Sequence, residues 1–206
     1  MAGAVNGAQG VFLPQLTAAF KSIDPTHTIS TEEFANACER ILPIFDHLGT
    51  VFGFARSELA TKRESIKSVA PRLKTLDEVV AADVKANTVT VKNSASRNLH
   101  RLVSAIGFIQ TLLANLASDP SVTLRGAASD AYNATMAPIH SYLVRKAVQA
   151  SMFTLPSRDH FLQSIGETEI TAKQHAEEFN PVANTIIARV EKLYPVKMPR
   201  SDTQWI

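Results

Sequence analysis

Residues 95–117, ASRNLHRLVSAIGFIQTLLANLA, decide the fold class of this chain. Apolar residues recur here with the spacing of an α-helix, and the seventeen residues from Leu102 to Ser118 carry no charge. That run is slightly shorter than a bilayer span, and its polar residues gather on one side of the helix. The stretch therefore predicts a long amphipathic helix of a soluble protein, closed by Asp119 and Pro120.

The rest of the chain repeats the helical period, and no segment alternates convincingly between apolar and polar residues. Ser30 and Glu33 form a capping-box pattern, and Pro138 and Pro181 predict kinks inside two long helices. The expected helices cover approximately residues 11–22, 30–44, 51–69, 76–87, 95–117, 127–154, 157–165 and 168–193. We expect one all-α domain of seven or eight helices over residues 10–206, after a flexible tail at residues 1–9.

Composition excludes several classes of protein. The 206 residues carry 21 basic and 19 acidic side chains, a balance that suggests neither a nucleic-acid binder nor a disordered chain. The single cysteine, Cys38, cannot form an internal disulfide or a thiolate zinc site. No metal-ligand spacing, phosphate-binding loop or nucleophile elbow occurs, so we expect no metal, no cofactor and no catalytic residues. The first residues lack a secretion signal, and we expect a cytoplasmic location.

Three predicted helices place polar side chains among apolar ones. On helical wheels, Glu58 and Lys62 interrupt one apolar stripe, and Arg97 and Arg101 interrupt another. His140 falls among apolar residues of the helix predicted over 127–154. Each case alone has an ordinary explanation, namely an i,i+4 salt bridge, a solvated first turn and a hydrogen-bonded core histidine. Together they bury three cations with one carboxylate, which is costly unless an anionic partner is present.

A phosphate group suits this excess of positive charge. Guanidinium forks can each bind two phosphate oxygens, and an ammonium adds a point charge. A phosphate carrying about −1.5 to −2 charges would balance the site. The apolar continuation of the same stripes could hold a hydrocarbon tail, so the residues predict a phospholipid-like amphiphile as ligand.

Three motifs in order resemble the glycolipid transfer protein superfamily. They are HSYLVRKAVQASMFTLP at residues 140–156, SRNLHRL at residues 96–102 and SELATK at residues 57–62. The resemblance covers about residues 10–206. It implies a two-layer helical sandwich that encloses an apolar lipid pocket and takes one sphingolipid.

The resemblance also implies roles for the polar residues. Glu58 matches the acidic position that binds the sphingoid amide and hydroxyl, and His140 matches the position that binds the amide carbonyl. Glycolipid-binding members carry asparagine and tryptophan at the positions of Lys62 and Arg101. Here both are cations, joined by Arg97, which resembles the ceramide-1-phosphate branch and its plant regulator of programmed cell death.

Two positions depart from the family pattern. Glu58 stands where the family usually has aspartate and is one methylene longer, so affinity or lipid choice could differ. Tyr142 stands where many members carry tryptophan, and the only tryptophan of this chain is Trp205. Contact with a membrane is therefore expected to rest on other apolar residues.

The implied function is non-vesicular transfer between membranes, or sensing, of ceramide-1-phosphate or phyto-ceramide-1-phosphate. The alternatives are glycosphingolipid transfer, a lipid-gated interaction protein of cell death, and an enzyme acting on a phosphomonoester or through Lys62 as a Schiff-base amine. We expect reversible peripheral contact with anionic membranes. The residues expected to dock are Phe153, Leu155, Phe161, Leu162, Arg145, Lys146 and Arg158. Phe161 and Leu162 could instead simply pack the short helix.

Overall fold

The computed structural model of the protein describes residues 12–198. The tail expected at residues 1–9 and Trp205 lie outside these residues. Within the described range the chain is helical, and the one β-type pairing there is an isolated antiparallel bridge between Ser30 and Thr75. The expectation of an all-α fold is confirmed.

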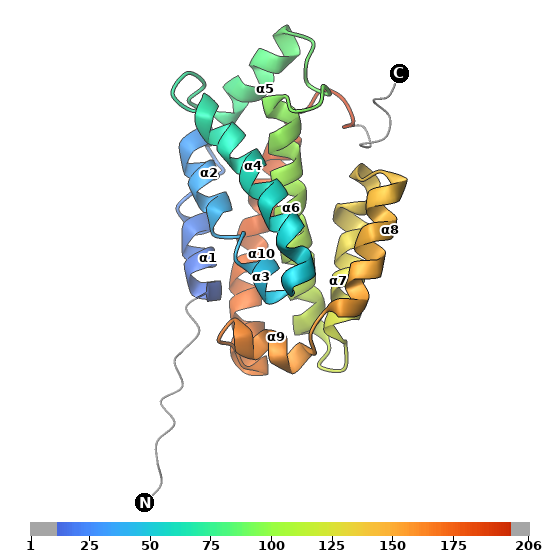
Figure 1. The fold of residues 1–206 in the computed structure, drawn as a ribbon. Coiled ribbons are helices and arrows are strands. Elements are labelled where there is room, and N and C mark those ends of the chain that lie inside the picture. Colours follow the sequence, from blue (N-terminus) through green and yellow to red (C-terminus); the bar gives the residue numbers. More distant parts are fainter. Residues whose placement is uncertain (1–11, 199–206) are drawn as a thin grey trace, which may run out of the picture.

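The helices pack around one central helix (Figure 1). In chain order the elements are α1 (Phe12–Lys21), α2 (Thr31–Glu39), α3 (Ile44–His47), η1 (Thr50–Phe52), α4 (Gly53–Val69), α5 (Leu76–Lys85), α6 (Ala95–Ser118), α7 (Leu124–Thr135), η2 (Ala137–Ile139), α8 (Tyr142–Ser151), η3 (Met152–Thr154), α9 (Arg158–Ser164) and α10 (Glu169–Glu191). Helix α6 packs against α4, α5, α7 and α10, while α1 packs against α10 and α2 against α4. Helix α8 stands at the edge of the bundle beside α7 (Figure 1).

Helix α6 is the core of the molecule rather than a membrane span. By length and composition it could cross a bilayer, but 61% of its most apolar window is buried inside the protein. Its leucines and isoleucines, such as Leu102, Ile106 and Leu112, are fully buried. Ser94 caps the helix by accepting a hydrogen bond from the backbone of Arg97, which fixes where the two arginines of its first turns begin.

The single helix predicted over residues 127–154 is wrong. The structure has α7, the short η2 and α8 in its place, because Pro138 lacks a backbone N–H and cannot continue α7. His140 has extended backbone angles between them, and the hydroxyl of Ser141 caps α8. The helical wheel that placed His140 among Leu143 and Val144 therefore does not describe this segment.

Candidate functional site

Helix α4 brings Glu58 and Lys62 to one side of the bundle. Their side chains form the expected ion pair one turn apart. The Lys62 side chain is only 15% exposed, whereas the Glu58 side chain is 65% exposed. The ammonium therefore lies inward and the carboxylate lies toward solvent.

Helix α6 supplies Arg97 and Arg101, and both are 5% exposed. The interpretation of a solvated first turn is thus wrong for this pair. The Arg97 guanidinium donates to the carbonyl of Thr90 over 2.9 Å. Burial lowers the pKa of Arg97, and burial together with the charge of Arg97 lowers the pKa of Arg101 to about 10. These are two like charges held close together and away from water.

His140 faces the same place from the segment between α7 and α8. Its Nδ1 lies 3.1 Å from the hydroxyl of Tyr132 on α7. Burial is the main cause that lowers the pKa of His140, the nearby Arg101 and Lys62 also lower it while Glu58 raises it, and the net value is about 4. The imidazole is therefore neutral at pH 7. Burial also raises the pKa of Tyr132 to about 12, so the phenol keeps its proton.

One cleft of about 430 Å³ is lined by all five residues predicted to bind the lipid headgroup and amide, namely Glu58, Lys62, Arg97, Arg101 and His140. Its complete lining is Phe54, Ala55, Glu58, Leu59, Lys62, Lys92, Asn93, Arg97, Asn98, Arg101, Met136, His140 and Val144. The polar groups share the cleft with an apolar wall, as an amphiphile requires. The described residues contain no cluster of three or more potential metal ligands.

Sequence reasoning missed three polar members of this cleft. Lys92 and Asn93 come from the loop before α6, and Asn98 follows Arg97 and is 6% exposed. The signal was present in the polar stretch over residues 87–96, which leads directly into the helix that carries both arginines.

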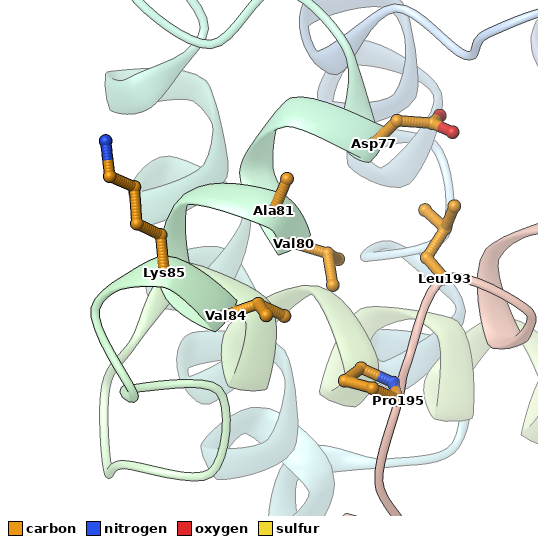
Figure 2. Close-up of a pocket in the computed structure, with 7 residues that line it drawn as sticks. All are labelled: Asp77, Val80, Ala81, Val84, Lys85, Leu193 and Pro195. Carbon is orange, nitrogen blue, oxygen red and sulfur yellow. The ribbon is translucent and has the colours of Figure 1, made fainter.

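A second hollow, of about 400 Å³, lies between α5 and the chain after α10. Figure 2 shows Val80 and Val84 of α5 beside Leu193 and Pro195. Asp77 at this hollow accepts a hydrogen bond from Arg189 at 2.7 Å. The one cation of its lining is Lys85, so this hollow lacks the cation cluster of the first cleft.

The residues expected to dock on membranes do not form one surface. Phe153 is 76% exposed, but Phe161 and Leu162 are 0% and 3% exposed and belong to the core. Phe161 and Leu162 therefore pack the short helix α9 against the core. Leu155 is half-buried and packs against the core. Arg145 is half-buried and Lys146 is exposed.

Arg158 is a structural residue in this protein. Its guanidinium binds both carboxylate oxygens of Glu169 at 2.7 and 2.6 Å. It also donates to the carbonyls of Leu116, Asp119 and Val122, which end α6 and begin the next loop. These bonds engage the guanidinium within the protein, and the contact of Arg158 with lipid stays a prediction.

The sequence did not predict a set of exposed apolar residues of which two, Phe54 and Val144, line the cleft, while Tyr142 and Leu143 directly precede Val144 in the chain. Phe54, Tyr142 and Leu143 are 50%, 59% and 77% exposed, and Val144 is 37% exposed. We call these four residues the apolar rim. Phe153 follows the other end of α8, which is about 15 Å long at the usual rise per residue. The rim and Phe153 are therefore separate surfaces.

The sequence and the structure match proteins of one family. The family described as "Glycolipid transfer protein (GLTP)" matches residues 29–167. The Arabidopsis thaliana "ACD11 homolog protein" is 31% identical over 163 residues, which cover 79% of this chain and 71% of the relative. The human "Ceramide-1-phosphate transfer protein" is 25% identical over 200 residues, covering 90% of this chain and 93% of the relative.

A solved structure shows the same fold with a ligand. A mutant of Arabidopsis accelerated-cell-death 11, crystallised as a complex with ceramide-1-phosphate, superposes with a TM-score of 0.83 at 28% identity. The match covers 88% of this chain and 94% of the other.

Proposed function

Because the chain belongs to the glycolipid transfer protein family, we propose that it carries a sphingolipid of the ceramide-1-phosphate class between membranes. One observation supports the proposal above all others. The side chains of Lys62, Arg97 and Arg101, which come from two helices, line a single cleft together with Glu58 and His140. We propose that residues 10–206 act as one lipid-carrying domain with no chemical step.

The cations of the cleft are suited to a phosphomonoester. Arg97 and Arg101 are buried enough for their pKa values to fall, so an anion beside them would relieve an existing electrostatic cost. A phosphate brings about −1.5 to −2 charges and three acceptor oxygens. A neutral sugar would relieve none of this cost, which argues against glycosphingolipid transfer.

Glu58 and His140 are suited to the ceramide amide. The hydroxyl of Tyr132 can donate to Nδ1 of His140, and in that arrangement the imidazole proton would lie on Nε2. That N–H would donate to the amide carbonyl of the lipid. The carboxylate of Glu58 would accept hydrogen bonds from the amide N–H and the neighbouring hydroxyl of the lipid. Lys62, its ion-pair partner, would then bind the phosphate.

The apolar wall of the cleft is suited to hydrocarbon chains. Moving a two-chain lipid through water exposes on the order of 30 methylenes, which costs roughly 25 kcal/mol. A cleft of about 430 Å³ lies toward the low end of the range for drug-sized ligands, so it must widen to hold such a lipid. Helix α8 is the wall that can move, because its buried side chains are only Val148 and Ser151.

We propose that the protein docks on membranes through the apolar rim. Tyr142 and Leu143 would enter the interface beside the mouth of the cleft, where cargo must pass. Lys146, whose ammonium lies 5.6 Å from the Tyr142 ring centre, and Arg145 would meet anionic headgroups. The contact would be reversible and peripheral, and the protein cytoplasmic between encounters.

Native mass spectrometry of the purified protein tests the proposed cargo directly. We expect a bound species with the mass of a ceramide-1-phosphate, and transfer of this lipid between vesicles in preference to galactosylceramide. Arg97→Ala should abolish most of that transfer, because it removes a buried headgroup cation. Equal transfer of both lipids, or unchanged transfer by Arg97→Ala, would contradict the proposal.

A further inference from the structure

The loop between α5 and α6 forms part of the candidate cleft. Lys92 and Asn93 of this loop line the cleft together with Arg97. Unlike Arg97 and Arg101, which are 5% exposed, Lys92 is an exposed residue. The cleft therefore has inner cations and an outer one.

Several hydrogen bonds hold this loop against the start of α6. Arg97 donates to the carbonyl of Thr90 at 2.9 Å, and Asn98 donates to the carbonyl of Asn93 at 3.4 Å. The hydroxyl of Ser94 donates to the carbonyl of Val89 at 3.3 Å. Asn93 itself adopts a left-handed conformation with φ of 65°, which asparagine tolerates better than most residues. The backbone on both sides of Lys92 is thus fixed relative to the headgroup arginines.

The position of Lys92 distinguishes two kinds of lipid phosphate. The ester oxygen of a bound headgroup must point toward the ceramide anchors Glu58 and His140, so its terminal oxygens point outward. A phosphomonoester ends there, and its second negative charge faces solvent. A phosphodiester such as sphingomyelin carries one charge instead and places a choline group at the same position.

We propose that Lys92 is a specificity-determining residue that favours phosphomonoester over phosphodiester sphingolipids. This inference rests on the proposed function. Lys92 adds an outer contact to the inner cations Lys62, Arg97 and Arg101. The outer ammonium attracts the second charge of a monoester and repels a choline group. Because Lys92 is an exposed residue, salt screens this contribution more than that of the buried arginines.

The test compares Lys92→Ala with Lys85→Ala. Lys85 is a second exposed lysine at the other hollow, and its removal changes the net charge equally (Figure 2). We expect Lys92→Ala to weaken binding of ceramide-1-phosphate about three- to tenfold at low salt, and less at high salt. Sphingomyelin binding should stay constant or improve. Lys92→Arg should restore the wild-type preference, and Lys85→Ala should behave as wild type.

The outcomes separate this inference from the proposed function. If wild-type protein binds ceramide-1-phosphate and Lys92→Ala matches Lys85→Ala for both lipids, the role of Lys92 is refuted while the cargo stands. If wild-type protein does not bind the lipid, the proposed function itself fails. An equal loss for both lipids would also overturn the role in specificity.

Discussion

Glu58 and Lys62 form an ion pair across one turn of α4, yet their side chains are 65% and 15% exposed. The carboxylate therefore holds the ammonium from the solvent side and leaves it directed into the cleft. A phosphate entering the cleft would share Lys62 with Glu58, and the amide of a sphingolipid would give the carboxylate a second partner. Under the proposed function, the pair would thus link recognition of the phosphate to recognition of the amide.

Replacing Glu58 should separate these two contributions. In Glu58→Ala we expect binding of ceramide-1-phosphate to fall about tenfold, because the amide and hydroxyl lose a charged acceptor. Binding of phosphatidic acid, which has no amide, should hold or rise because Lys62 loses a competing anion. Vesicle-binding assays with both lipids measure the difference. Glu64→Ala removes a similarly exposed carboxylate, 68% exposed and paired with Arg63, and serves as the control. Parallel losses for the two lipids would count against the assigned role.

Arg101 should lower the stability of the lipid-free protein. Burial and the charge of Arg97 depress its pKa to about 10, so folding works against this charge. We expect Arg101→Met to raise the free energy of unfolding by about 1–3 kcal/mol while strongly reducing ceramide-1-phosphate transfer. Urea denaturation and a vesicle transfer assay measure the two effects. Arg72→Met, at an exposed position, should change neither. A destabilised Arg101→Met protein would show that the charge is well compensated.

Acid should destabilise the protein through His100 and His140. Both pKa values fall to about 4, mainly through burial and in part through the charge of Arg101. The unfolded chain, with histidine near pKa 6.5, binds protons that the folded chain does not, so stability falls as pH drops through this window. Between pH 7 and pH 5 the loss should be about 2 kcal/mol for each histidine. Denaturation of wild-type and His140→Gln protein at the two pH values tests this, and the variant should lose about half of the effect.

Leu143 should contribute to membrane contact rather than to folding. Its side chain is 77% exposed on α8, one residue before Val144, which lines the cleft. We expect Leu143→Ser to weaken sedimentation with anionic vesicles several-fold and to leave the melting temperature unchanged. Ile170→Ser is the matched control, since Ile170 is 72% exposed at the start of α10. If both variants bind vesicles as well as wild type, the apolar rim is not the docking surface.

Arg158 should matter for stability alone. Its bonds to Glu169 and to three carbonyls tie α9 and α10 to the end of α6. We expect Arg158→Ala to lower the free energy of unfolding by about 2–4 kcal/mol, because those carbonyls and the carboxylate lose their donor. Vesicle binding by the folded variant should remain as in wild type. Reduced vesicle binding without loss of stability would restore Arg158 to the membrane surface.

Much of the fold could be predicted from the sequence, because the spacing of apolar residues indicates both a helix and the face of it that is buried. The pattern of α6 was clear over its whole length, and the hydroxyl of Ser30 does cap α2. The sequence predicts a kink at Pro138, since the apolar pattern continues across it. Whether a proline bends or ends a helix depends on packing beyond it, and a helical wheel does not contain that information.

The residues of the candidate site could be predicted where a charged residue interrupts the apolar stripe of a helix. Arg97, Arg101 and Lys62 were found in this way, and the structure brings them into one cleft. Lys92 was missed because a loop has no period against which an inward residue stands out. Exposure of Phe161 was misjudged for a related reason, since a seven-residue helix shows too few turns to define its buried face.

Helix α8 touches the rest of the protein through few side chains, and Val144 beside the cleft is left 37% exposed. Two acyl chains beneath this helix would supply the missing apolar contacts. The bound lipid would then form an exchangeable part of the hydrophobic core. Under the proposed function, loading would then resemble the last step of folding, and unloading at a membrane would resemble its reversal.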